Sequence, residues 1–168
     1  MIVSSIILAA CISPIHEDKG TVTSTYGWRI LHGRTEKTVH VGVDIAADAG
    51  TKVRTVFRGK VIFARMDAHG GGLMIDVLSY RDGQQSVMRY AHLSKITVKE
   101  GDIVKSNQVI GLVGSTGNST GPHLHIEYLV KRPGRSDLYK NPSKFLCKYD
   151  KNILLPHFKI EKRFHIEN

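Results

Sequence analysis

The chain has 168 residues with an ordinary share of apolar and charged side chains, so it is long enough for one domain with its own core. Lys and Arg outnumber Asp and Glu by 24 to 15, giving a formal net charge of +9. This balance favours anionic surroundings such as nucleic acid, a membrane surface or a cell-wall polymer. The sequence has no long Lys/Arg run, zinc-finger spacing or aromatic stripe, so we expect no nucleic-acid partner.

The N-terminal segment has two interpretations. Residues 1–10 are apolar apart from two serines and are too few to span a bilayer as a helix. Residues 8–11 are similar to a bacterial lipobox, in which case Cys11 would be lipidated after signal cleavage and would anchor the protein to a membrane. However, no Lys or Arg precedes the apolar run. The alternative is a first buried strand of a protein that is not exported or that a phage delivers.

The rest of the chain reads as short strands separated by turns. Apolar and polar residues alternate in segments bounded by Gly, Pro or Asn, and no 3.6-residue stripe is sustained before residues 138–147. This pattern predicts an all-β sandwich or barrel with few or no helices, in a domain spanning residues 12–147. The expected strands are 21–29, 39–45, 50–65, 73–79, 87–93, two short ones within 98–114, and 123–130, with turns at 69–72 and 81–83.

The end of the chain carries no functional signal of its own. Residues 148–168 form a basic extension in which apolar residues at even positions indicate an edge strand or a docking segment. Cys147 and Cys11 lack the spacing of metal ligands. A disulfide between them stays an open alternative, because the sequence does not give the distance between the two ends.

Two of the expected strands carry potential ligands on one face. In residues 39–45 four β-branched apolar residues alternate with His40, Gly42 and Asp44, so these three share a face, and Gly42 leaves space between them. In residues 123–130 the residues His123, His125 and Glu127 share a face in the same way. A buried His–Asp pair, or a chance pair among nine histidines, would produce either pattern alone.

A third histidine, His92, is expected at the end of the strand over residues 87–93. A hydrolytic zinc site needs three protein ligands and one open position for water, and imidazole and carboxylate groups suit Zn²⁺. The chemistry also needs a base and a donor that stabilises the oxyanion. Five groups on three strands meet this requirement together: His40, Asp44, His92, His123 and His125.

These residues stand in motifs that resemble a known family. Residues 40–44, 90–93 and 121–125 look like the three motifs of lysostaphin/LytM-type zinc metalloendopeptidases. Residues 26–29 and 109–117 also resemble segments of that family, so the resemblance extends over residues 20–146. Three motifs in the family's order are far more specific than any one of them.

The resemblance implies a two-sheet antiparallel β groove, of the duplicated-hybrid or barrel-sandwich kind, that cuts peptide cross-links of bacterial peptidoglycan. Carried over by position, His40, Asp44 and His125 would bind one Zn²⁺ per chain. His92 and His123 would flank the water as general base and transition-state stabiliser. The implied location is the cell envelope, as a periplasmic, lipidated or secreted protein, with a phage virion as the alternative. We expect a monomer.

One departure from the family affects the oxyanion site and the choice of substrate. Some members place a tyrosine in the loop before the first ligand, but residues 30–39 contain none, so Tyr26, Arg29 or nothing would replace it. By default we expect cleavage of a D-Ala–diaminopimelate cross-link rather than a polyglycine bridge. Other polar residues are expected to be structural: His69 and Asp48 in turns, Asp76 on a strand surface, and His16, His32, His157 and His165 in solvent.

Two rival functions remain. Some family members have lost ligands and act as regulators of other hydrolases, but all five positions are filled here. Residues 98–113 also resemble a biotinyl or lipoyl carrier domain. Such a domain needs an exposed lysine at a hairpin tip, typically in a Met-Lys pair, and the sequence has no such pair.

Overall fold

The structure is a computed structural model that describes residues 12–15, 19–30, 35–81 and 83–146. The expectations for residues 1–11, for Cys147, for His16, His32, His157 and His165 and for the extension 148–168 lie outside these ranges. Within them, no helix is long and apolar enough to cross a membrane.

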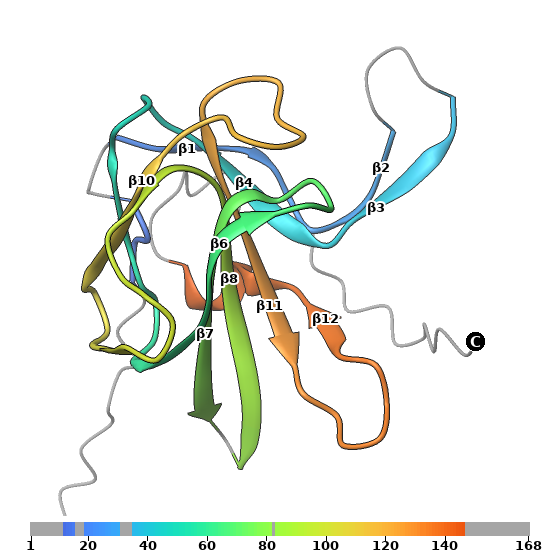
Figure 1. Ribbon diagram of the computed structural model, residues 1–168. Coiled ribbons are helices and arrows are strands. Elements are labelled where there is room, and N and C mark those ends of the chain that lie inside the picture. The colour runs from blue at the N-terminus through green and yellow to red at the C-terminus, as the bar shows by residue number, and fades with distance from the viewer. Residues whose placement is uncertain (1–11, 16–18, 31–34, 82, 147–168) are drawn as a thin grey trace, which may run out of the picture.

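The described residues form β-strands and one short 3₁₀ helix, as the alternating pattern predicts (Figure 1). The strands, in chain order, are β1 (Thr21–Ser24), β2 (Gly27–Ile30), β3 (Lys37–His40), β4 (Gly42–Ala46), β5 (Lys52–Arg54), β6 (Gly59–Asp67), β7 (Gly72–Arg81), β8 (Gln84–Ile96), β9 (Ile103–Val104), β10 (Val109–Val113), β11 (His123–Val130) and β12 (Leu138–Lys140). The 3₁₀ helix η1 (Pro142–Phe145) stands where the sequence first hinted at helical spacing.

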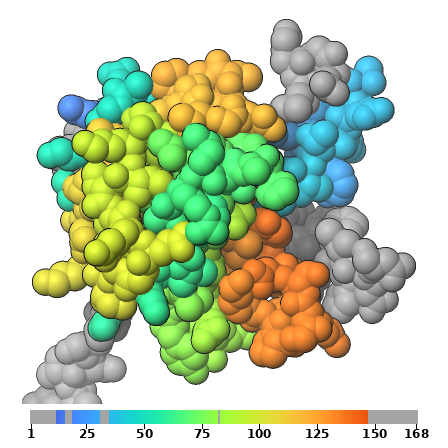
Figure 2. All heavy atoms as spheres, in the orientation of Figure 1, coloured from blue at the N-terminus to red at the C-terminus, as the bar shows by residue number. Residues whose placement is uncertain are grey.

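The strands pair in two antiparallel sheets, which confirms the expected all-β class. The larger sheet has ten strands, with the central order β1-β4-β11-β8-β7-β6-β9. It branches because β8 also pairs with β10, which in turn pairs with β5, while β12 pairs with β11. The smaller sheet is the β2–β3 hairpin, which stands out from the rest of the described surface (Figure 2). β11 therefore lies between β4, which carries Asp44, and β8, which carries His92.

The hydrophobic core determines which face of β11 is buried and which face is left for polar residues. In β11, Leu124 and Ile126 are fully buried, whereas His123 and His125 on the opposite face are partly accessible. Burying one face of each strand removes apolar side chains from water at about 25 cal/mol per Å², and the polar face is left for the site. The core cluster also includes Ile45, Ile75, Val77, Tyr90, Leu93 and Ile110 from the neighbouring strands.

Four predicted strands were wrong in detail. Residues 21–29 are divided into β1 and β2. Residues 39–45 are two strands broken at Val41, because β3 pairs with β2 whereas β4 pairs with β1 and β11. Residues 50–65 are likewise divided into β5 and β6. The strand expected to end at His92 runs on to Ile96, because a bulge lets the chain continue past the histidine.

Candidate metal centre and active site

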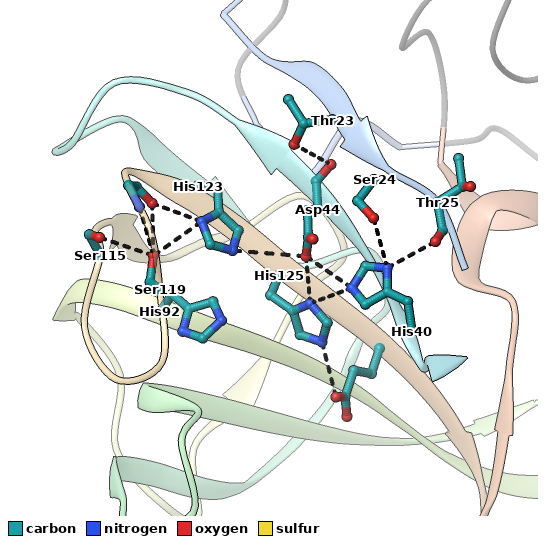
Figure 3. A network of polar contacts seen from close by, with 12 residues as sticks. Thr23, Ser24, Thr25, His40, Asp44, His92, Ser115, Ser119, His123 and His125 are labelled. Atoms are coloured by element: carbon teal, nitrogen blue, oxygen red, sulfur yellow. Dashed lines mark hydrogen bonds and ion pairs between the residues drawn. The ribbon is translucent and has the colours of Figure 1, made fainter. Parts of the chain in front are cut away.

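Three side chains from β3, β4 and β11 converge on one point (Figure 3). Nε2 of His40 lies 3.1 Å from Oδ1 of Asp44 and 3.2 Å from Nδ1 of His125. Nδ1 of His125 lies 2.6 Å from the same carboxylate oxygen. Asp44 and His125 are brought together because they are opposite each other in the β4–β11 register. These three form a group that could hold a metal ion.

Gly42 makes room for this convergence. A Cβ atom at this position would lie 2.5 Å from Cε1 and 2.7 Å from Nε2 of His125, and 2.6 Å from the backbone oxygen of Ile126. The expected free space between His40 and Asp44 is therefore filled by the His125 ring. Only a residue without a side chain allows that ring to lie against β4.

Hydrogen bonds at the far sides of the two rings fix their tautomers. Nδ1 of His40 donates to the carbonyl of Thr25 at 2.9 Å, because a carbonyl can only accept. Nε2 of His125 donates to Oε1 of Glu127 at 3.0 Å. The lone pairs of His40 Nε2 and His125 Nδ1 therefore point towards Asp44. Three acceptors that face one another within this distance need a shared cation or proton.

The electrostatics follow from this arrangement. Burial disfavours a charged Asp44, but its close contacts with the imidazoles of His125 and His40 outweigh burial and hold the pKa of this carboxyl well below its usual range. Burial likewise disfavours a charged His125, yet its hydrogen bonds to Asp44 and Glu127 raise the pKa of His125 to about 9. A proton on His125 therefore lies between the ring and the Asp44 carboxylate.

Arg29 and Tyr26, which the sequence analysis considered for the oxyanion site, make other contacts in the structure. Nη1 of Arg29 donates to Oδ2 of Asp44 at 3.3 Å and also to the hydroxyl of Ser24. This contact leaves Oδ1 turned towards the two histidines. The hydroxyl of Tyr26 donates to the carbonyl of Tyr139 at 3.2 Å. Arg29 therefore orients the Asp44 carboxylate, and Tyr26 is engaged in the scaffold.

His92 is held in an unusual backbone conformation. Its φ is 62°, which is uncommon for a residue with a side chain. Between the pairs Leu73↔Leu93 and Ile75↔Tyr90 the register shifts, so β8 has one residue more than β7. Such a bulge re-aims a side chain and is often found beside active sites. The backbone N–H of His92 donates to the carbonyl of Gly71 at 2.8 Å, which fixes the bulge.

His92 and His123 form a second pair beside the first group, with ring centroids 4.7 Å apart. Each donates its Nδ1 hydrogen to a backbone carbonyl at 2.8 Å, His92 to Thr116 and His123 to Gly121. Both therefore present an unprotonated Nε2, and that of His123 lies 3.8 Å from Oδ1 of Asp44. Burial, together with nearby His123 and His125, lowers the pKa of His92. The pair is suited to accept a proton.

A cleft of about 530 Å³ opens beside these groups. His92 and His125 line it, and so do Arg89, Glu127 and Tyr139, to which the sequence analysis gave no role. Glu127 could have been found from its position two residues after His125 on the same strand face. Arg89 and Tyr139 could not, because nothing in their local sequence connects them to the histidine motifs.

Of the polar residues expected to be structural, His69 and Asp48 lie where the sequence predicts, and Asp76 does not. His69 lies in the turn after β6, as expected, and it also lines the cleft. Asp48 lies in an exposed loop, where its carbonyl accepts from the N–H of Thr51. The interpretation of Asp76 as a strand-surface group was wrong. It is 7% exposed and binds Arg89 through both carboxylate oxygens.

Comparison with known proteins connects this geometry to a family. The profile of peptidase family M23 matches residues 38–137. Lysostaphin of Staphylococcus simulans is 42% identical over 108 residues, which are 64% of this chain and 21% of that protein. The peptidoglycan DD-endopeptidase ShyA of Vibrio cholerae is 39% identical over 116 residues, 68% of this chain and 26% of ShyA. The chain thus spans about a fifth to a quarter of the length of these relatives.

Solved structures agree with the sequence matches. The catalytic domain of lysostaphin, described as an antimicrobial peptidase, superposes with a TM-score of 0.65 at 37% identity, covering 75% of this chain and 91% of that domain. A zinc-containing peptidase from Vibrio cholerae gives a TM-score of 0.63 at 33% identity, covering 76% of this chain and 37% of that protein. The chain belongs to peptidase family M23.

Proposed function

We propose that this chain is a zinc-dependent endopeptidase that hydrolyses peptide cross-links of bacterial peptidoglycan. His40, Asp44 and His125 bind one Zn²⁺, and the convergence of three potential ligand atoms on one point carries this proposal. Two imidazoles and a carboxylate are the ligand set of catalytic zinc sites that keep a fourth position open.

The spacing of the ligand atoms suits zinc. Four ligands at tetrahedral positions, with bonds of about 2.1 Å, are separated by about 3.4 Å. The three atoms here are separated by 2.6 to 3.2 Å, so a small expansion accommodates the ion. Glu127 binds the far nitrogen of His125, and the carbonyl of Thr25 binds that of His40, as is usual around zinc-bound imidazoles.

The protein's own groups manage the proton. Zinc lowers the pKa of a bound water towards about 7 and polarises a carbonyl. His92 and His123 present unprotonated Nε2 atoms beside the ligand group, so one accepts the proton of the attacking water. Once protonated, such an imidazole becomes a donor that stabilises the developing oxyanion or protonates the leaving amine. The carbonyls of Thr116 and Gly121 keep both rings oriented throughout.

The relatives support peptidoglycan as the substrate. The name of ShyA describes a peptidoglycan DD-endopeptidase, and the chain resembles it over 68% of its own length. A D-Ala–diaminopimelate cross-link is accordingly the bond that we propose. The protein would act at the cell envelope, or from a phage virion, as a monomer with its metallopeptidase domain in residues 12–147. The family match and the described fold both fall within this range.

Chelation tests the proposal. Purified protein should reduce the turbidity of a cell-wall suspension, lose this activity in chelator and regain it with added Zn²⁺. His125→Ala should lose both zinc and activity. His123→Gln should keep stoichiometric zinc while kcat falls by about 10²- to 10⁴-fold. Lysis that persists in chelator would refute the metal mechanism. A wild-type protein without stoichiometric zinc or lysis would favour the regulator.

A further inference from the structure

Three charged residues form a row across the large sheet, beside the ligand group. Asp76 on β7 pairs with Arg89 on β8, and Arg89 pairs with Glu127 on β11. The next residue in the same row is Gly42 on β4, where the His125 ring takes the place of a side chain. The row therefore leads directly from β7 to a proposed zinc ligand.

Every contact along this row is a charged hydrogen bond. Nε and Nη2 of Arg89 donate to the two oxygens of Asp76, each at 2.9 Å. Nη1 of Arg89 donates to Oε2 of Glu127 at 3.1 Å. The other oxygen of Glu127 accepts from Nε2 of His125 at 3.0 Å. Bidentate pairs of this kind fix geometry as well as charge.

Because these side chains are largely buried, removing one of them would leave a buried charge without its partner. The side chains of Asp76 and Glu127 are 9% and 10% exposed, and that of Arg89 is 25% exposed. The carboxylates of Asp76 and Glu127 both contact Arg89, and the positive guanidinium between them offsets their mutual repulsion. The hydrogen bond with Asp76 in turn raises the pKa of Arg89, so its charge is permanent. Each member thus depends on the next.

We propose that Asp76, Arg89 and Glu127 form a positioning chain that keeps His125 in the tautomer and orientation needed to bind a metal through Nδ1. Glu127 holds the proton of His125 on Nε2, Arg89 fixes the carboxylate of Glu127, and Asp76 fixes the guanidinium of Arg89. None of the three touches the reacting atoms. The inference rests on the proposed zinc site, and it predicts a loss of metal affinity from a residue on β7, two strands away from β11.

Zinc affinity and imidazole NMR test this chain together. We would titrate wild type, Glu127→Gln and Asp76→Asn with Zn²⁺ against a competing chelator. In metal-free and loaded protein, we would follow the Nε2–H resonance of His125. Glu127→Gln should weaken zinc binding by about 10- to 100-fold. Asp76→Asn should weaken it less and shift the same resonance, although it contacts neither His125 nor the metal.

Controls separate positioning from general damage. Glu100→Gln removes an ion pair with Arg65 on the exposed part of β6 and should leave zinc affinity and the resonance unchanged. Melting curves show whether each variant folds. If Glu127→Gln does not fold, the zinc affinity and the resonance of Asp76→Asn carry the test. Zinc affinities within twofold of wild type, with an unshifted resonance, would overturn the positioning chain while leaving the zinc site intact. A wild type that binds no zinc would instead overturn the proposed function.

Discussion

At the scale of single residues, the site depends on where lone pairs and protons lie. Carbonyl and carboxylate acceptors hold the far nitrogens of His40, His92, His123 and His125, so each imidazole presents a defined atom to the centre. Side chains alone would not ensure this, because a free imidazole exchanges its tautomers. The three backbone carbonyls and the Glu127 carboxylate that accept these hydrogen bonds are therefore as much a part of the site as the rings.

Gly42 provides a direct test at this scale. In Gly42→Ala, the methyl group would meet both the His125 ring and the backbone oxygen of Ile126, and the backbone atom cannot rotate away. We expect the free energy of unfolding to fall by about 1–3 kcal/mol and zinc affinity to fall with it. Thermal melting and chelator competition measure the two effects.

The matched control is Gly121→Ala. A Cβ atom at Gly121 would meet nothing within 4 Å, and its carbonyl can still accept from His123. This variant should bind zinc and melt like wild type. If the two alanine variants behaved alike, close packing of His125 against β4 would not be what requires glycine at position 42.

At the scale of elements, the strand types were predictable but their breaks were not. Alternation placed His40 and Asp44 on one face, and it placed His123 and His125 on another, because a period of two is local information. The break at Val41 depends on two different pairing partners, β2 for β3 and β11 for β4. The row from Asp76 to Glu127 depends on register between strands distant in sequence. A single strand pattern contains neither kind of information.

His92 shows the same limit more sharply. The sequence predicts that it lies near a strand end, yet its role depends on a bulge and a positive φ. Those features are fixed by the turn before β7 and by the loop after β10, which meet over the histidine. The two segments approach closely, because a Cβ atom on Gly72 would overlap the hydroxyl oxygen of Thr116.

Thr116 links these elements, so its hydroxyl can be tested. It accepts from the N–H of Leu73 at 2.9 Å and donates to the carbonyl of Leu93 at 2.8 Å, while the Thr116 carbonyl holds His92. Thr116→Val should lower the free energy of unfolding by about 1–3 kcal/mol, because a partly buried N–H loses its partner. It should also lower kcat, since the bulge loses its clamp.

Thr116→Ser removes the methyl group but keeps the hydroxyl, so it is the control in which both hydrogen bonds are retained. Denaturant unfolding gives the stability of both variants, and steady-state hydrolysis gives kcat. Equal kcat in Thr116→Val and wild type would show that His92 is positioned without this clamp.

At the scale of the whole molecule, the sheet brings the three motifs together and the surface carries the charge. β11 lies between β4 and β8, so residues that are far apart along the chain meet beside the cleft that His92 and His125 line. The net charge of +9 is not needed for this geometry. Long-range attraction to an anionic wall polymer is the role that it suits.

Salt dependence tests that role. The Debye length shortens from about 8 Å at 0.15 M salt to about 3 Å at 1 M, so attraction between exposed charges is screened. Binding to purified sacculi that carry anionic polymer should weaken as salt rises, and sacculi stripped of the polymer should bind less at low salt. Salt-independent binding in a sedimentation assay would contradict an electrostatic contribution.

Mass spectrometry of the fragments released from defined sacculi tests the central claim most directly. Zinc-loaded wild type should release strands whose peptide cross-links are cut, with one new amino and one new carboxyl terminus at D-Ala–diaminopimelate. The glycan strands should stay intact, and neither chelated protein nor His125→Ala should release these fragments. New reducing sugar ends, or peptide cleavage that continues without metal, would contradict the assignment of this site as a zinc endopeptidase.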